Sequence, residues 1–273
     1  MKRSLSLLVI VAATVLGLRP AHAQMLSRGD LFGPGAPPPM VAIEVGLGKH
    51  QQQGTYDAAC GCTFQDGTGS GLFGSIAFEL PLDYEWAIGL KGGIDFKNTA
   101  STTAITDQAI ISNPNTGTTD TGYTLSGMSI DRVGTVKTTY AVLNPYVQYQ
   151  FFRMGPFVQA GPSFGFLMSN HFTHVRNLLS TTATINGTTY DNLRFSSSGT
   201  TEETVEDGPI TDASGMRIGL LISAGYNIGV SERSVLSPLL TYDFPITAIR
   251  SSAASGWKIG SLYISAVLKF KLD

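Results

Sequence analysis

The last twelve residues of the chain, Leu262–Asp273, alternate strictly between apolar and mostly polar side chains. Successive residues of an extended strand point to opposite faces. One face carries Leu262, Ile264, Ala266, Leu268, Phe270 and Leu272, and the other carries Tyr263, Ser265, Val267, Lys269 and Lys271. This pattern predicts a terminal β-strand with one apolar face, which needs partners to cover its edges.

Seven earlier stretches alternate in the same way, and we predict that they are also strands. In chain order they are 41–48, 71–80, 86–97, 138–151, 156–168, 214–230 and 235–246. Pro145 lies inside the fourth of these stretches. Because proline has no amide hydrogen, we expect a bulge or a gap in the pairing at that point.

The connections between the predicted strands alternate in length. Tight turns fall at residues 81–85, 152–155 and 231–234, whereas long polar loops rich in Gly, Ser and Thr fall at 50–70, 98–134 and 169–212. An up-and-down sheet with this order has its long loops at one end and its short turns at the other. Asn186-Gly187, between β-forming residues, predicts a hairpin within the third loop.

The N-terminus has the three parts of an export signal. Residues 1–3 are basic, residues 5–18 are apolar, and Ala21-His22-Ala23 is a small-x-small cleavage site. We predict a signal peptide over residues 1–23, with a retained anchor helix as the alternative. Residues 24–40 are rich in Pro and Gly, which predicts an extended lead-in to the region 41–273.

Composition limits what the mature chain can be. Only 14% of the 273 residues are charged, and 31 are glycine. After residue 23 no stretch approaches the roughly 18 apolar residues that a spanning helix needs, so a membrane crossing would require a closed sheet. Loss of Lys2, Arg3 and Arg19 with the signal changes the net charge from −2 to −5. A mildly acidic chain is a poor candidate for binding nucleic acid.

The second face of the predicted strands is rich in glycine and carries the mid-strand charges. We predict that this face lines a lumen and that its charges form a network of four acids and four bases: Glu44, Glu79, Asp95, Asp243, Lys91, Arg217, Lys269 and Lys271. Side chains nearly fill the interior of an eight-stranded barrel. A closed, salt-bridged interior is therefore expected. A soluble barrel or sandwich that exposes this face to water is the alternative.

Two features resemble bacterial outer-membrane barrels: the closing strand, with Phe270 near its end, and the segment Gly155-Pro-Phe-Val-Gln-Ala-Gly-Pro162. On these residues the chain resembles the outer-membrane protein β-barrel domain family, which includes the PorT-like proteins and shares its architecture with the transmembrane part of outer membrane protein A. The resemblance implies an all-β, eight-stranded antiparallel up-and-down transmembrane β-barrel in the bacterial outer membrane, with short periplasmic turns and long extracellular loops.

The same resemblance implies the partners of the chain. They are outer-membrane lipid and the barrel-assembly machinery, with Phe270 as the assembly signal, and the protein is expected to be a monomer. Members of the family usually end in Phe, whereas three residues follow Phe270 here. Aromatic residues near strand ends predict the interfacial girdles of such a barrel; they include Phe78, Trp86, Phe151, Phe166, Phe244 and Trp257.

Cys60 and Cys62 lie in the first long loop. They could form a strained disulfide, pair with another chain, bind a metal or remain free. Two cysteines with one spacer lack the ligand spacing of a structural zinc site. We predict neither a metal nor a cofactor, and the state of the two thiols stays open.

Three histidines, His50, His171 and His174, fall near the predicted outer rim. Beside a serine and a carboxylate they could serve a lipid hydrolase, but the chain has no Gly-x-Ser-x-Gly elbow, and solvated rim histidines are the simpler interpretation. We predict no catalytic residues. The expected function is a non-enzymatic envelope protein whose loops contact other molecules, including an extracellular ligand; a narrow channel or carrier for small solutes is the alternative.

Overall fold

The computed structural model describes residues 37–58, 62–112, 123–152, 154–185, 188–250 and 256–272. The predicted signal peptide and the lead-in up to residue 36 lie outside these ranges. Within the described residues there is no helix with the length and apolar character needed to cross a bilayer.

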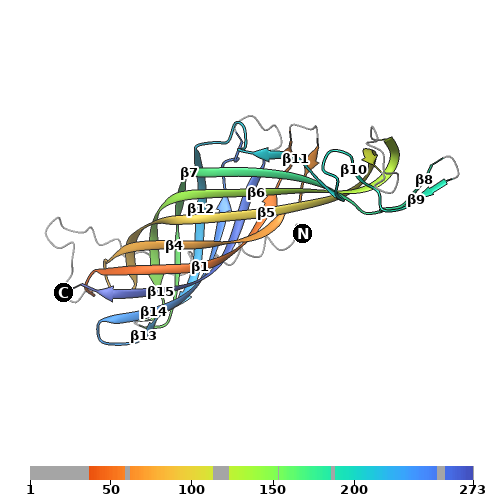
Figure 1. Cartoon of the computed structure of the whole chain (residues 1–273). Helices are drawn as coiled ribbons and strands as arrows, with labels where there is room; N and C mark the ends of the chain where they lie inside the picture. Colours follow the sequence, from red (N-terminus) through yellow and green to blue (C-terminus); the bar gives the residue numbers. More distant parts are fainter. Residues whose placement is uncertain are drawn as a thin grey trace, which may run out of the picture. The chain divides into compact units, whose positions relative to one another are not determined.

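Eight long strands form one antiparallel sheet (Figure 1). They are β1 (Met40–Gln53), β4 (Thr68–Pro81), β5 (Trp86–Ser112), β6 (Tyr123–Gln150), β7 (Pro156–Leu178), β12 (Met216–Tyr226), β14 (Ser234–Pro245) and β15 (Lys258–Lys271). Each pairs with its neighbours in chain order. The last strand pairs with the first, from Met40↔Lys271 to Gln53↔Lys258. These pairings run in a closed circuit, which confirms the predicted ring of eight strands and its closure by β15.

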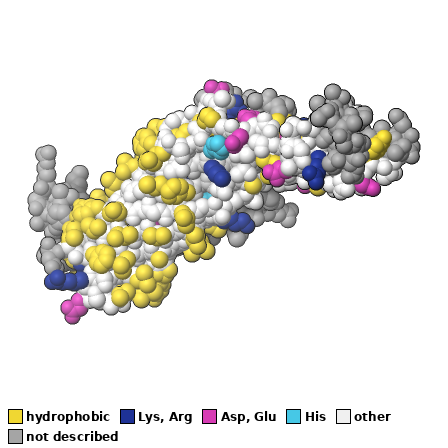
Figure 2. All heavy atoms as spheres, viewed as in Figure 1, with side chains coloured by type: hydrophobic (Ala, Val, Ile, Leu, Met, Phe, Trp, Pro, Cys, Tyr) yellow, Lys and Arg dark blue, Asp and Glu magenta, His cyan; other side chains and the backbone are white. Residues whose placement is uncertain are grey.

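The two faces of the ring differ as the alternation predicts. In β1, Ile43, Val45 and Leu47 are at least half exposed, whereas Ala42 and Glu44 are buried. The same holds in β15, where Ile264 is 70% exposed and its neighbours Tyr263 and Ser265 are buried. Apolar side chains therefore cover the outside of the barrel wall as a broad belt (Figure 2).

Pro145 interrupts one ladder, as expected. The pairing of β6 with β7 stops at Leu143↔Phe164 and resumes at Val147↔Ala160. The stretch predicted as one strand at 214–230 is also broken, because β12 ends at Tyr226 and a short strand β13 (Ile228–Gly229) follows.

The second and third predicted loops are wrong in large part, because they contain long strand segments. β5 and β6 stay paired from Trp86↔Tyr149 to Ile111↔Tyr123, and β7 follows β6 as far as Ile130↔Leu178. We call the part of these strands beyond the apolar belt, residues 98–112, 123–137 and 171–178, the extension. On β5 the belt ends at Phe96, an exposed apolar residue that is followed outward by Asn98.

Short strands complete the extension. β10 (Arg194–Phe195) pairs with the end of β5, and β11 (Glu202–Gly208) pairs with β7. The predicted hairpin around Asn186-Gly187 is present as β8 (Ala183–Ile185) and β9 (Thr188–Tyr190), although its two central residues lie outside the described ranges. In the first loop, β2 (Tyr56–Asp57) pairs with β3 (Thr63–Phe64). The extension thus continues the barrel sheet outward, with β10 and β11 added to it.

Candidate functional site in the lumen and the extension

The buried charged side chains of the barrel are balanced. Among the described residues these are four acids and four bases, all less than one-tenth exposed: Glu44, Glu79, Asp95, Asp243, Lys91, Lys97, Arg217 and Lys269. Seven of them belong to the predicted network. The eighth is Lys97 instead of Lys271, so the predicted balance holds with one different member.

The half of the lumen nearest the short turns contains two ion pairs. Lys91 Nζ lies 2.9 Å from Glu44 Oε2, and Lys269 Nζ lies 2.9 Å from Glu79 Oε2. Glu44 Oε1 accepts a hydrogen bond from the Ser265 hydroxyl at 2.7 Å. Glu79 Oε2 also accepts from the Tyr146 hydroxyl at 3.0 Å, and Glu79 Oε1 accepts from Lys269 at 3.2 Å. Each buried carboxylate therefore has both a cation and a neutral donor.

The other half of the lumen is organised around Lys97. Its ammonium lies 3.0 Å from both Asp95 and Asp243, and it also donates to the hydroxyls of Ser261 and Tyr263. Arg217 forms a second ion pair with Asp243, and the Tyr263 hydroxyl donates to both oxygens of Asp95 at 2.8 Å. A buried charge is costly unless it is paired and hydrogen-bonded. These contacts give each of the four charges an opposite partner and connect β5, β12, β14 and β15, while Arg217 Nε and Nη1 and Asp243 Oδ1 have no hydrogen-bond partner among the described residues.

Lys271 does not belong to this network. Its ammonium is exposed and donates to the Glu232 carbonyl oxygen, 2.7 Å away, in the turn that joins β13 to β14. It has the same strand parity as Lys269, but it lies at the last paired position of β15. Parity alone therefore assigned it to the lumen wrongly. In β5, Lys97 has the same parity as Asp95, so the sequence pattern could have predicted that Lys97 faces inward.

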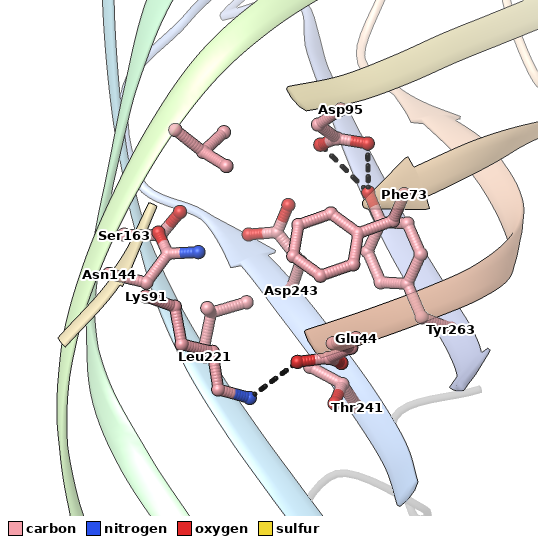
Figure 3. A pocket seen from close by; sticks show the side chains of 11 residues that line it. Glu44, Phe73, Lys91, Asp95, Asn144, Ser163, Leu221, Thr241, Asp243 and Tyr263 are labelled. Carbon is pink, nitrogen blue, oxygen red and sulfur yellow. Dashed lines mark hydrogen bonds and ion pairs between the residues drawn. The ribbon is translucent and has the colours of Figure 1, made fainter. Parts of the chain in front are cut away.

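Little space remains between the lumen side chains. A cavity of about 20 Å³ lies at mid-height, lined by residues that include Asp95, Asn144, Asp243 and Tyr263 (Figure 3). A space of this size holds about one or two water molecules. A larger hollow of about 510 Å³ opens at the short-turn end and reaches inward to Glu79 and Lys269. The Glu44–Lys91 pair lines the smaller cavity, and the Glu79–Lys269 pair lines the larger hollow.

An aromatic cluster lies at the long-loop end of the barrel. We call it the cap: Tyr56, Ala58, Cys62, Phe64, Val136, Phe172, Ile210, Ile249, Trp257 and Ile259. Tyr56 contacts both Phe172 and Trp257, with ring centroids 4.5 and 4.8 Å apart. The lumen residue Gln52 of β1 donates to the Phe64 carbonyl oxygen at 2.9 Å, which joins the cap to the barrel. Burial and the nearby Glu206 carboxylate raise the pKa of Tyr56 to about 12.

Trp257 belongs to this cap, so its predicted place in an interfacial girdle is wrong. Its side chain is completely buried. The other predicted girdle residues are exposed on the outside of the ring: Phe78, Trp86, Phe151, Phe166 and Phe244. Trp86 contacts Tyr149 there, with ring centroids 4.8 Å apart.

Gly134 of β6 makes room for the cap. A Cβ atom at this position would lie 2.7 Å from the ring of Phe64, closer than a real Cβ contact allows. Phe64 also contacts Phe172 and His174 edge-on. Packing at this glycine therefore anchors the first loop against the extension.

Two of the three histidines are not solvated, so that expectation is wrong for them. His50 is buried in the lumen, with Nδ1 2.8 Å from the Ser261 hydroxyl and Nε2 3.2 Å from the Phe96 carbonyl oxygen. His174 is buried beside the cap, and burial, followed by the Arg132 and Arg176 charges, lowers its pKa to about 4. Only His171 of the three is exposed.

His171 forms an exposed pair with Asp207. Its Nε2 lies 2.7 Å from Asp207 Oδ1, which also accepts a bond from the Thr173 hydroxyl at 3.0 Å. These two hydrogen bonds lower the pKa of the Asp207 carboxyl. The pair links β7 to β11 across the surface of the extension.

The cysteine prediction is tested at one residue. Cys62 is buried in the cap and is disulfide-bonded. Cys60 lies outside the described residues, so its pairing with Cys62 stays a prediction. No group of three or more metal-ligating side chains occurs in the described part of the chain.

Residues 40–250 match the family model of the outer membrane protein beta-barrel domain. The chain belongs to this family. The outer membrane is therefore its location, the short turns are periplasmic, and the extension and cap are extracellular. No curated protein sequence matches the chain.

Several solved structures are similar at low identity. Ail of Yersinia pestis, crystallised with the heparin analogue sucrose octasulfate, is 10% identical over 85% of this chain and 99% of its own, with a TM-score of 0.31. OprG from Pseudomonas aeruginosa is 10% identical over 87% of this chain and 99% of its own, with a TM-score of 0.37. The outer membrane protease OmpT from Escherichia coli is 12% identical over 86% and 97%, with a TM-score of 0.31.

Proposed function

We propose that the chain is a sealed, non-enzymatic outer-membrane protein that presents its extension at the cell surface for contact with other molecules. The observation that carries this proposal is the combination of a lumen filled by paired charges with an extension that has its own buried core. The barrel then serves as an anchor, and the extension is the part that acts.

The filled lumen argues against the channel alternative. Four acids and four bases are buried there, and the mid-lumen cavity of about 20 Å³ is too small for a hydrated solute. An opening would have to separate several buried ion pairs, and breaking one such pair costs about 3–5 kcal/mol. The apolar cap adds a second barrier above the charges.

Two constellations could suggest an enzyme, and neither has the geometry of one. His50 and Ser261 are hydrogen-bonded, but both are buried in the lumen, and the Ser261 hydroxyl is also held by Lys97. His171 and Asp207 are accessible, but the hydroxyl beside them, that of Thr173, donates to Asp207 and not to the histidine. An activated nucleophile requires the base to accept its proton.

The extension has the features of a built structure. Beyond the cap it contains a second buried cluster, which we call the distal cluster: Ile111, Met128, Ile130, Leu178, Leu193 and Phe195. Joining the barrel strands would require only short connections, such as the periplasmic turns. A folded extension with two apolar clusters supports a role in which its shape matters.

The outer surface of the barrel supports the proposed contacts with lipid and with the assembly machinery. The exposed apolar belt fits outer-membrane lipid. Phe270 is exposed on β15, opposite Val41 of β1, in a position that suits an assembly signal at the closing seam. Contact with the barrel-assembly machinery and a monomeric barrel remain parts of the proposal.

The test uses refolded protein and a trimmed variant. In the variant, residues 103–132 are replaced by Asn-Gly, because Thr102 and Val133 face each other across the β5–β6 pair and a two-residue turn can close the hairpin. We expect no conductance steps from the full chain in planar bilayers, and loss of surface binding by cells that carry the trimmed chain. Steady conductance of the full chain, or equal binding by both chains to cells, matrix proteins and glycans, would contradict the proposal.

A further inference from the structure

The short-turn end of the barrel has an apolar side, which is formed by two connections. One is the β6–β7 turn at 151–155, and the other is the segment 226–230, which leads from the end of β12 through β13. Both expose large apolar side chains. We call these side chains, which are between 39% and 68% exposed, the turn patch: Phe151, Phe152, Met154, Tyr226, Ile228 and Val230. Arg153 lies outside the described residues.

Hydrogen bonds hold the two connections against each other. The backbone amide of Asn227 donates to the Gly155 carbonyl oxygen at 2.8 Å, and the side-chain amide of Asn227 donates to Gln150 Oε1 at 2.6 Å. The β6–β7 turn and the segment after β12 therefore have a fixed position relative to each other.

Side-chain contacts make the turn patch continuous. A Cβ atom added at Gly155 would lie 3.8 Å from Phe152 and 3.9 Å from Tyr226, so both side chains lie beside this glycine. A Cβ atom at Gly229 would lie 2.9 Å from the Met154 methyl group, which places Met154 against the segment after β12. The patch is thus one apolar surface that spans both connections.

The neighbouring turns at this end of the barrel carry charges instead. The β4–β5 turn contains Asp83 and Glu85, and the turn before β14 contains Glu232 and Arg233, all of them exposed. Charged side chains suit a turn that is surrounded by water. A contiguous exposed apolar surface, in contrast, marks contact with another apolar surface.

We propose that the turn patch is embedded in the lipid of the inner leaflet of the outer membrane, whereas the charged turns lie in the periplasm. Distance agrees with this contact. Phe152 lies one residue beyond the wall residue Phe151, and Val230 lies two residues beyond Ile228, which still pairs with β14. These steps correspond to roughly 3–7 Å. Apolar groups enter the boundary between headgroups and acyl chains to a depth of about 5–10 Å.

Continuity with the belt selects lipid as the partner. The outward-facing residues that lead to the patch are exposed and apolar on both strands, as shown by Val147 on β6 and by Ile222 on β12. A periplasmic protein bound to the patch would meet this belt at its edge, where lipid already covers the wall. The barrel is therefore anchored more deeply on the side of β6, β7 and β12. This inference concerns the periplasmic end and is independent of the function proposed for the extension.

The experiment places single tryptophans at the short-turn end. The background replaces both native tryptophans with phenylalanine. Phe152→Trp and Val230→Trp report on the patch, and Glu85→Trp and Glu232→Trp are matched exposed positions on the charged turns. Each protein is folded into lipid nanodiscs, in which a soluble quencher reaches both sides of the bilayer. Heat-modifiable migration on gels verifies that each variant is folded.

We expect the emission of the two patch variants to lie at shorter wavelength and to resist acrylamide, a quencher in the water. It should fall strongly in phosphatidylcholine that is brominated near the headgroup end of its acyl chains. The Glu85→Trp and Glu232→Trp variants should show the opposite behaviour. If acrylamide quenches the patch variants as strongly as Glu232→Trp, the contact with lipid is disproved and the patch is open to a periplasmic protein. That result would leave the proposed function standing, because its test depends on the extension.

Discussion

The barrel and the extension are made from the same strands, but the inward face of these strands is polar in the barrel and apolar in the extension. Along β6, Asn144 and Gln148 are buried inside the barrel, while Leu143 and Val147 are exposed to lipid. Further along the same strand, Met128, Ile130 and Val136 are buried and Ser129 is exposed. The surrounding solvent thus decides which face is apolar, and one continuous strand changes its pattern where it leaves the hydrocarbon.

The inversion also changes what holds each part together. In the lumen, stability depends on specific partners, because one missing charge leaves its partner buried and unpaired. In the extension, stability depends on apolar burial. Replacing a buried side chain there by a smaller one lowers stability in proportion to the buried volume that is lost. The two parts should therefore fail differently when single residues are changed.

The largest expected effect comes from opening the ring. Deletion of residues 262–273 removes most of β15 and leaves β1 and β14 with unpaired edges in hydrocarbon, where each unsatisfied backbone group costs several kcal/mol. We expect that the chain without residues 262–273 does not insert into the membrane.

Two other variants serve as controls. The trimmed chain that lacks residues 103–132 should insert normally, and Phe270→Ala should only slow assembly. Heat-modifiable migration on gels measures all three, and insertion of the deleted chain would disprove the role of closure.

Next in size is the loss of a lumen charge. Lys97→Met leaves Asp95 and Asp243 without their shared ammonium, which should lower the free energy of unfolding by about 3–5 kcal/mol. Lys271→Met is the matched control, because that ammonium lies at the exposed turn. It should change stability by less than about 0.5 kcal/mol. Urea unfolding in lipid vesicles measures both, and equal losses would argue against the network.

These two lysines also show what the sequence could predict. The alternation of apolar and polar residues predicted the ring, its closure and seven of the eight buried lumen charges. It could do so because each barrel strand has lipid on one side and a narrow interior on the other. Lys271 was misassigned because parity does not say where a strand leaves the lumen. Residues 98–112 read as loop because Thr99 and Ser101 occupy inward positions, and residues 123–134 because the inward positions after Met128 and Ile130 are Arg132 and Gly134, so in both segments the apolar alternation is weak.

A smaller effect is expected in the cap. Phe172→Ala removes a buried ring that contacts Tyr56 and Phe64, and such a change typically costs about 3 kcal/mol at the low end of its range. The loss should appear as faster hydrogen exchange and proteolysis of the extension, with unchanged heat-modifiability of the barrel. Phe166→Ala on the same strand, at an exposed position of the belt, is the control and should leave the extension unaffected. Equal exchange in wild type and Phe172→Ala would show that the cap does not hold the extension.

The smallest expected effect is a pH dependence confined to the extension. His174 has a pKa of about 4 in the folded protein, below its ordinary value near 6.5, because burial and two nearby arginines disfavour its charged form. The unfolded extension then binds more protons than the folded one between pH 6.5 and 4, so stability is greatest above this window and falls on acidification. From pH 7 to pH 5 the loss of stability should be about 2 kcal/mol.

Trp257 fluorescence in a Trp86→Phe background follows unfolding of the cap, since Trp257 packs against Tyr56 there. His174→Gln should remove the pH dependence, whereas the exposed His171→Gln should retain it; a dependence that survives the first change would place its origin elsewhere in the extension.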